Sequence, residues 1–361
     1  MAEHTPLHEA TTKAGAAFVE DAGWLAPAHF GDPTAEYNHA HHGCVVLDQS
    51  NRGKVELTGK EAAFFLNNLC TNDVKNLPLG AGCEFFLTTA KAKIVAHGFL
   101  YHVRLSEGQP ALWLDLEPGM GEKVIQHLDH FVISEQVEFA DRTREFGQMH
   151  LAGPNAVAVL ERALMDDIPP LAELQHMERT FGADATCHIR RRDPLGLPGF
   201  DVVCLRTRAE NVWQMLLRAG AQPAGKEAFD ALRVEAGTPV WGADIDENTF
   251  APEVGRNTQA ICYTKGCYLG QEPIVMARDR GQVNRTLLGV KLPSGIVPRG
   301  SALFREGKDV GRVMTNLQSP RLGTVIGLAY VRRGSQEPGT KLEVETGGQR
   351  QTAEVVKLPF E

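Results

Sequence analysis

Two cysteines close to a lysine form the combination of side chains in this sequence best suited to chemistry. Cys262 and Cys267 flank a four-residue segment that contains Lys265. A nearby ammonium group can lower the pKa of a thiol and favour the thiolate, which binds metals and attacks electrophiles. Free cysteines are also common as small buried residues. The spacing alone therefore leaves both a chemical and a structural role open.

Histidines and arginines form two further clusters. His39, His41, His42 and Cys44 are of metal-ligating types, but their spacing matches no common zinc pattern, so we prefer a helix end with solvated imidazoles. The run Arg190–Arg192 predicts a solvated loop or strand end. The sequence contains no dinucleotide-binding glycine motif, no P-loop and no His-Glu-x-x-His site, which disfavours nucleotide and zinc-protease functions.

Alternating helical and strand patterns must position these residues. Alanines and Phe18 on one side of a helical wheel predict a helix over His8–Glu20, followed by a packed loop from Trp24 to Phe30. Strand patterns at Phe85–Thr88 and Ile94–Val103 predict a hairpin around a short polar turn. Further predicted strands are Ala111–Leu116, Val137–Ala140 and Phe200–Leu205, and predicted helices are Lys60–Cys70, Met120–His130, Asn155–Leu164, Ala209–Ala219 and Lys226–Ala236.

The helical pattern stops after about residue 280. Short strands broken by proline and glycine follow as far as Lys357, which is typical of a small all-β barrel or sandwich. We therefore predict an α+β protein with one region over residues 1–280 and a β-rich domain over residues 281–361.

Composition limits the classes of function. The formal charge of −8 disfavours nucleic-acid binding through overall charge. The start of the chain has no basic segment followed by an apolar run, and no stretch approaches the roughly 18 apolar residues of a membrane span. The seven cysteines form an odd, scattered set that suggests reduced thiols. We expect a soluble, cytoplasmic protein.

One segment resembles a specific family signature. The run Lys265–Glu272 reads Lys-Gly-Cys-Tyr-Leu-Gly-Gln-Glu and resembles the Lys-Gly-Cys-aromatic-x-Gly-Gln-Glu signature of YgfZ-type folate-binding proteins. The rest of the chain resembles the wider glycine-cleavage T-protein superfamily from end to end. The matching segments are Thr5–Leu7 with Gly23 and Trp24, Thr71–Val74, Leu232–Gly237 with Gly242 and Asp244, and Ser319 and Pro320 with Pro359 and Phe360.

This resemblance implies a three-lobed fold around a central channel for tetrahydrofolate, with two interwoven α/β lobes and the β-rich tail as a C-terminal barrel. Arg233 matches the family arginine that faces the folate, and Asp201 matches an acidic pterin contact. A carboxylate can grip the donor edge of a pterin, and an arginine can pair with carbonyl or glutamate oxygens. The alternative for Arg233 is an ion pair on the helix surface with Asp230 or Glu235.

The predicted hairpin departs from the pattern of true aminomethyltransferases. Those enzymes place a carboxylate pair after a Gly-Gly turn, whereas this chain has Ala96 and His97 there. Methylene transfer produces cationic intermediates that a carboxylate stabilises. Alanine cannot do so, and His97 remains a candidate base and folate contact without a fixed negative charge.

The turn of the hairpin resembles the YgfZ-type sequence Asp-Ala-Lys-Gly-Lys. Lys91 and Lys93 match its lysines and can reach an anionic folate tail, although a solvated turn is equally compatible. Thr89 replaces the acid and Ala92 the glycine, which puts the conformation of the turn in question, because glycine reaches positive φ more readily than alanine.

The signature implies a role for Cys267. It is a candidate cluster ligand or redox-active thiol, or else the turn shapes the folate channel, with Gly266 and Gly270 allowing close backbone approach. The signature residues are Lys265, Gly266, Cys267, Tyr268, Gly270, Gln271 and Glu272.

Three functions follow from the resemblance. The leading hypothesis is a tetrahydrofolate-binding accessory factor for iron–sulfur cluster assembly or repair, with iron–sulfur proteins or assembly factors as partners. The second is the aminomethyltransferase of glycine cleavage, which the full-length N-terminal segment through Trp24 supports. The third is another folate-linked reaction, such as a demethylation.

Overall fold

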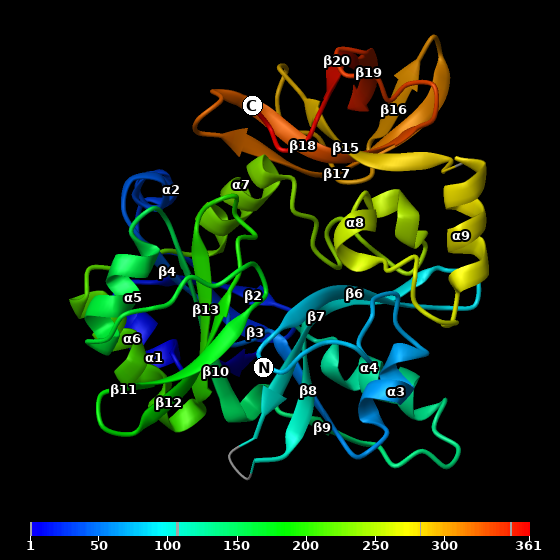
Figure 1. Ribbon diagram of the computed structural model, residues 1–361. Coiled ribbons are helices and arrows are strands. Elements are labelled where there is room, and N and C mark those ends of the chain that lie inside the picture. Colours follow the sequence, from blue (N-terminus) through cyan, green and yellow to red (C-terminus); the bar gives the residue numbers. More distant parts are fainter. Residues whose placement is uncertain (1, 106–107, 282, 347–348) are drawn as a thin grey trace.

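Three lobes make up the molecule, as Figure 1 shows. The computed structural model describes residues 2–105, 108–281, 283–346 and 349–361. Two lobes are sheets covered by helices, and the third is a closed six-stranded barrel at the top of the view. The chain crosses from one sheet to the other and back, so that the two lobes are interwoven. The predicted α+β, three-lobed architecture is confirmed.

The first thirty residues form a small three-stranded sheet. Helix α1 (His8–Lys13) is followed by β2 (Ala17–Asp21), which pairs antiparallel with β3 (Trp24–His29), and β3 runs parallel to β1 (Glu3–His4). Gly15 has a φ of 90° where the helix ends, a conformation that glycine adopts without steric cost. The predicted helix over His8–Glu20 and the loop after it are therefore wrong beyond Lys13.

A six-stranded sheet with the order β11-β12-β13-β10-β4-β14 forms the core of one lobe. Its strands are β4 (Val45–Asp48), β10 (Phe146–Ala152), β11 (His176–Phe181), β12 (Ala185–Arg191), β13 (Gly199–Leu205) and β14 (Gln222–Pro223). Its helices are α2 (Pro33–His42), α5 (Ala156–Leu164) and α6 (Ala209–Arg218), with a 3-10 turn at Arg206–Arg208. Apolar residues of α5 and α6, such as Val159 and Trp213, pack against the sheet and bury its outer face.

The second lobe is a five-stranded antiparallel sheet with the order β6-β7-β8-β5-β9. Its elements are β5 (Gly53–Thr58), α3 (Ala62–Asn67), β6 (Gly82–Thr88), β7 (Ile94–Arg104), β8 (Pro110–Leu116), α4 (Gly121–Asp129), β9 (Glu138–Asp141) and a 3-10 turn at Thr143–Glu145. Strands β6 and β7 form the predicted hairpin. Ala92 adopts the left-handed conformation at its turn, with a φ of 54°, which an alanine reaches at a higher energetic cost than a glycine.

Helix α7 (Lys226–Ala236) links the six-stranded sheet to the barrel, because it packs on β4, α2 and the barrel residue Leu317. The chain then passes through a 3-10 turn (Ala251–Val254), α8 (Asn257–Ala260) and α9 (Gln271–Arg280) along one side of the molecule. The barrel strands are β15 (Arg285–Lys291), β16 (Ala302–Arg305), β17 (Lys308–Ser319), β18 (Thr324–Arg332), β19 (Lys341–Thr346) and β20 (Gln349–Val356).

Charged side chains are buried where the two large sheets face each other. The guanidinium of Arg190 stacks on Tyr101 of the other sheet and pairs with Asp115, with 3.2 Å between Nη1 and Oδ2. Arg192 stacks on Phe99. The prediction that the arginine run is solvated is wrong for Arg190 and Arg192, because both bridge the lobes and are almost fully buried.

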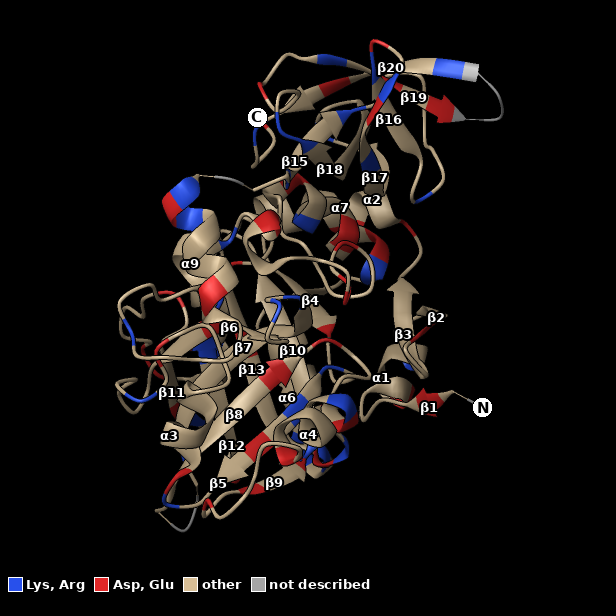
Figure 2. Cartoon of the chain, turned by 90° about the vertical axis from the view of Figure 1, so that its right-hand side faces the viewer, with Lys and Arg blue, Asp and Glu red and all other residues tan. Residues whose placement is uncertain are grey.

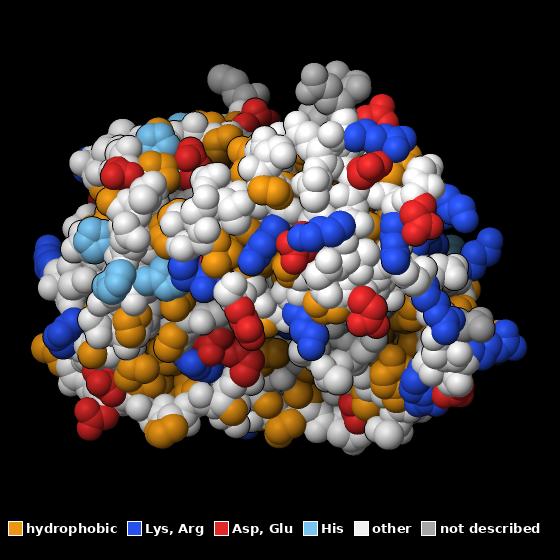
Figure 3. Space-filling model, turned by 90° about the horizontal axis from the view of Figure 1, so that it is seen from above, with side chains coloured by type: hydrophobic (Ala, Val, Ile, Leu, Met, Phe, Trp, Pro, Cys, Tyr) orange, Lys and Arg blue, Asp and Glu red, His pale blue; other side chains and the backbone are white. Residues whose placement is uncertain are grey.

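The surface carries mixed charge. Figure 2 marks acidic and basic positions interspersed along the ribbon, and Figure 3 shows acidic and basic side chains interspersed on the barrel face of the molecule. Within the described residues, no helix has both the length and the apolarity that crossing a bilayer requires.

Candidate functional site at the junction of the lobes

A cavity of about 620 Å³ lies where the lobes meet. Its wall combines β2 and β3, the turn between β4 and β5, the segment before α4, helix α7, the loop that follows α7, and the barrel. Its charged lining residues are Asp21, Asp48, Arg52, Glu117, Lys226, Asp230, Arg233 and Arg299. The volume is in the range of cavities that hold small molecules.

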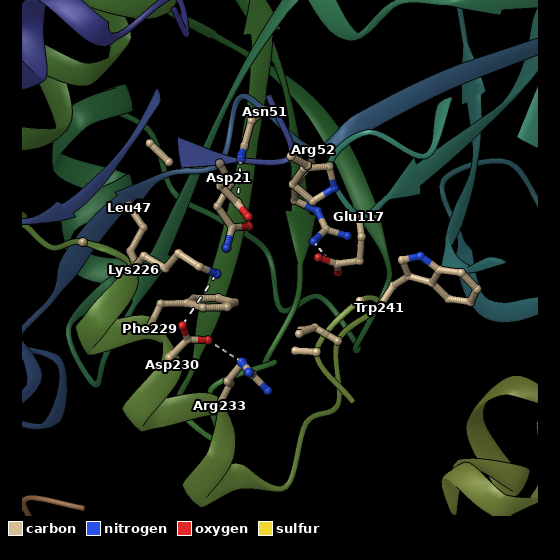
Figure 4. Close-up of a pocket in the computed structure, with 18 of the residues that line it drawn as sticks. Asp21, Leu47, Asn51, Arg52, Glu117, Lys226, Phe229, Asp230, Arg233 and Trp241 are labelled. Carbon is tan, nitrogen blue, oxygen red and sulfur yellow. Dashed lines mark hydrogen bonds and ion pairs between the residues drawn. The ribbon is translucent and has the colours of Figure 1, made fainter. Parts of the chain in front are cut away.

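Helix α7 presents a row of side chains to the cavity, as Figure 4 shows. Arg233 donates from Nε to Asp230 over 2.6 Å and from Nη1 to Asp244 over 2.8 Å. Its Nη2 makes only a 3.5 Å contact with the hydroxyl of Thr315 in the barrel. Arg233 thus forms one of the two predicted ion pairs, but it is buried, and one nitrogen is available to a ligand.

The opposite side of the cavity carries Arg52 and Glu117 (Figure 4). Arg52 donates from Nε to Asp115 over 2.5 Å and from Nη1 to Glu117 over 2.7 Å. Burial opposes the charged form of Glu117, but the adjacent guanidinium outweighs it and lowers the pKa of this carboxyl. Arg52 and Glu117 therefore form a charged pair that is fixed in place at the wall.

Two buried polar atoms in this wall have no partner among the described residues. They are Nη2 of Arg52, a donor, and Oε1 of Gln49, an acceptor. Both residues line the cavity and are more than nine-tenths buried. Because unpaired buried polar groups are costly, such atoms indicate a ligand or water that pairs with them. Phe229 and Trp241 add aromatic surface to the same cavity.

Asp201 lies outside the lining of this cavity. It is fully buried in β13 and accepts hydrogen bonds from Nδ1 of His150 over 2.7 Å and from Nη1 of Arg192 over 3.2 Å. Burial opposes the charged form, but the Arg192 guanidinium and the hydrogen bond to His150 outweigh it and hold the pKa of Asp201 well below its usual range. The structure gives its carboxylate internal partners and does not bring it together with Arg233.

The predicted hairpin residues are also separate from the cavity. His97 is buried and shares the carboxylate of Glu84 with Arg256, with 2.8 Å between Nε2 of His97 and Oε1. Lys91 is exposed at the turn. Lys93 donates to the carbonyl of Asn248 over 2.6 Å and lines a different, basic depression at the barrel edge.

The signature segment packs on the hairpin. The ammonium of Lys265 donates to three carbonyls, those of Asn67, Cys70 and Asn72. Cys267 is exposed and does not line the cavity. A Cβ at Gly270 would lie 2.5 Å from the Thr88 hydroxyl, whereas one at Gly266 would meet nothing. Of the two glycines, only Gly270 therefore packs closely against another segment, and that segment is the hairpin and not the cavity.

Sequence reasoning missed most of the wall. Gln49 and Arg52 belong to a turn that joins a strand of one sheet to a strand of the other, and no motif in the sequence singled them out. Glu117 follows a buried strand, and Phe229 lies on the predicted helix α7. A charged residue directly after a buried strand was the available signal for Glu117.

The histidine cluster forms the end of α2. Nδ1 of His39 lies 2.9 Å from the carbonyl of Ala35, and Nδ1 of His42 lies 2.8 Å from that of Asn38, one turn earlier. Among the described residues, no three His, Cys, Asp or Glu side chains are arranged to hold a metal ion. The placement agrees with the predicted helix end.

Glu84 predicts an acid-sensitive stability. Burial opposes its charge, but His97 and Arg256 outweigh that effect and lower its pKa from 4.5 to about 2. Since the folded-state pKa is the lower one, the stabilisation is complete above pH 4.5 and is lost as the pH falls towards 2. Urea unfolding across this window should show a decline of up to about 1.4 kcal/mol per pH unit from this group. In Glu84→Gln this component should be absent; an unchanged slope would contradict the assignment.

Fold and cavity together define a class: a three-lobed protein with a polar, ligand-sized cavity at the junction of its lobes. Sequence comparison names the family. Residues 7–258 match the GCVT N-terminal domain and residues 285–360 match the glycine cleavage T-protein C-terminal barrel domain. The chain therefore belongs to the glycine cleavage T-protein family.

Individual relatives agree with this assignment. An aminomethyltransferase of Rippkaea orientalis is 30% identical over 99% of this chain and 96% of its own length. One of Rubrobacter xylanophilus is 30% identical over 99% of this chain and 93% of its own. The crystal structure of the glycine cleavage system aminomethyltransferase T from Bartonella henselae has a TM-score of 0.89 at 24% identity, covering 100% of this chain and 98% of that one. That likeness shows the fold.

These relatives correct the leading functional hypothesis. They are named aminomethyltransferases and match essentially the full chain. The prediction of a YgfZ-like factor for iron–sulfur cluster assembly is therefore wrong, and the alternative of an aminomethyltransferase is favoured. The eight-residue signature misled because it is local, whereas the family matches span both the interwoven lobes and the barrel.

Proposed function

We propose that the protein is a tetrahydrofolate-dependent aminomethyltransferase of the glycine cleavage type. The observation that carries this proposal is the pair of unmatched buried atoms at the cavity wall, Nη2 of Arg52 and Oε1 of Gln49. A pterin has both an acceptor carbonyl and donor N–H groups along one edge, so it can satisfy both atoms. The names of the full-length relatives support the same reaction.

The remaining lining fits the rest of a reduced folate. Phe229 and Trp241 offer flat apolar surface for the rings, because aromatic groups stack well on one another. Arg233 has a nitrogen available for a carbonyl or carboxylate oxygen, and such charge-assisted hydrogen bonds are strong. We further propose that residues 1–280 form the folate-binding region. The barrel domain, residues 281–361, then closes the cavity with Arg299 and Thr315.

The proposed reaction takes an aminomethyl group from a dihydrolipoyl thioether. The carbon–sulfur bond breaks, ammonia leaves, and the carbon forms a methylene bridge between two amines of tetrahydrofolate while the thiol is restored. The two amine protons pass to ammonia and to the thiol, so no oxidant or reductant is required. In this chain the cavity wall orients the folate and excludes water, which keeps the reactive cation from hydrolysis.

Ammonia release tests the proposal. The protein, tetrahydrofolate and an aminomethyl-lipoyl carrier protein should together release one ammonia for each methylene-tetrahydrofolate formed. Omission of tetrahydrofolate should reduce the rate by at least about 100-fold, since the acceptor amines position the carbon for transfer. No ammonia release at saturating tetrahydrofolate would contradict the proposed function.

A further inference from the structure

Four carboxylates line the cavity, and three of them have other partners. Asp48 accepts hydrogen bonds from the Thr5 hydroxyl over 2.6 Å and from the Ser50 amide over 2.9 Å, and burial raises its pKa. Asp21 accepts from the amide of Asn51 over 2.9 Å. Asp230 lies between Arg233 and Lys226, which neutralise it. Asp230 is therefore neutralised by two cations and Asp48 by burial and hydrogen bonds, whereas Asp21 pairs only with a neutral amide.

Glu117 is different. Its Oε1 accepts from Arg52 over 2.7 Å, and Oε2 has no hydrogen bond among the described residues. Its side chain is 15% exposed, and that exposure opens to the cavity. Arg52 also serves Asp115, so one guanidinium is shared by two carboxylates. Asp115 also pairs with Arg190, so Glu117 is the carboxylate of this cluster that lines the cavity, and one of its two oxygens has no hydrogen bond to the described residues (Figure 4).

The strand register places Glu117 beside the unusual hairpin position. Gly98 of β7 pairs with Leu116, the last residue of β8. Neighbouring strands of a sheet lie about 5 Å apart. The chain therefore leaves the sheet at Glu117 close to the part of β7 that carries residue 97.

We propose that Glu117, held by Arg52, supplies the negative charge that stabilises the cation formed during aminomethyl transfer. This inference rests on the proposed function. When the carbon–sulfur bond breaks, its electron pair leaves with sulfur and the nitrogen lone pair forms a carbon–nitrogen double bond, giving a methaniminium cation. Glu117 takes no proton in this step, because its role is electrostatic. A fixed charge in a water-poor site is effective since it needs no reorganisation.

Glu117→Gln tests the inference, because glutamine keeps the shape and an acceptor for Arg52 but removes the charge. We expect kcat for ammonia release to fall by about 10²–10³-fold. KM for tetrahydrofolate should change by less than about threefold, because the ground state carries no cation at this point. Glu117→Asp retains the charge and should be at least roughly 10-fold faster than the glutamine variant.

Glu56→Gln is the matched control. Glu56 is a buried carboxylate of the same sheet, held by Arg142 over 3.0 Å and by Trp113 over 2.9 Å, and it lies outside the cavity. Its kcat should equal that of the unaltered protein. Near-UV circular dichroism establishes folding of each variant. A glutamine variant at position 117 that is folded and as fast as the unaltered protein overturns the inference alone. An unaltered protein that releases no ammonia overturns the proposed function and this inference together.

Discussion

Replacing Arg52 with methionine is expected to lower the free energy of unfolding by about 3–5 kcal/mol, since it removes the cationic partner of Glu117 and one of the two guanidinium groups that pair with buried Asp115. Arg52 is 4% exposed and joins Asp115 of β8 to Glu117 at the cavity wall. Asp115 is itself 1% exposed and cannot gain water in exchange. Methionine has a similar length, so the loss should come from charge rather than from an empty space. Urea denaturation at neutral pH measures it.

Arg144→Met is the control for this prediction. Arg144 also pairs with a glutamate, Glu3, with 2.5 Å between Nη2 and Oε1, but both side chains are largely exposed. Exposed ion pairs contribute less than about 1 kcal/mol because water and salt screen them. Equal losses in the two variants would show that Arg52 does not have the buried structural role assigned to it.

Arg233→Met is expected to reduce the stabilisation that tetrahydrofolate gives to the folded protein by about half or more. A ligand at 100 times its Kd raises the free energy of unfolding by about 2.7 kcal/mol. Loss of a charge-assisted hydrogen bond from Arg233 should weaken folate binding by about 10–100-fold. The folate-dependent rise in Tm should therefore fall to about half of its value in the unaltered protein, or less. The Tm without folate should also fall, because buried Asp244 loses its cationic partner.

Arg321→Met separates the binding role from the structural one. Arg321 belongs to the barrel and pairs with Glu235, which lies on α7 as Arg233 does, with 3.1 Å between Nε of Arg321 and Oε2 of Glu235. Arg321 lies outside the cavity lining. This variant should keep the folate-dependent rise in Tm, whatever its effect on stability. If Arg233→Met keeps that rise as well, then Arg233 only anchors α7, and its assignment to folate is wrong.

Local patterns were sufficient for much of the fold. The β6–β7 hairpin, helices α4 to α7 and the strands of the barrel follow from periodicity and turn residues that lie close together in the sequence. The N-terminal sheet could not be predicted in this way. Ala17–Asp21 is a strand because it pairs with Trp24–His29, and that partnership overrides the helical spacing of the alanines.

The site depends on contacts that the sequence does not display. Arg52 and Asp115 are 63 positions apart, and Arg233 and Thr315 are 82 apart. The family resemblance selected Arg233, which lines the cavity, and Asp201, which lies outside its lining and pairs with His150 and Arg192. Buried charged side chains pair across the two facing sheets of this protein. Their partners are far apart in the sequence, so only the three-dimensional structure shows which groups pair.

The signature segment shows why a precise local match misled. Lys265 is held by three carbonyl groups, and Gly270 packs closely on the hairpin turn at Thr88 and Thr89. These contacts give the segment a role in anchoring the loop before α9. These contacts restrict which residues fit at positions 265 and 270, but they do not place Cys267 in the cavity.

The central claim is that the cavity between the lobes binds a reduced folate. Calorimetric titration of the unaltered protein with tetrahydrofolate, under anaerobic conditions, tests it most directly. We predict a saturable heat of association with one site per chain. Titration that produces only the heat of dilution would contradict the account.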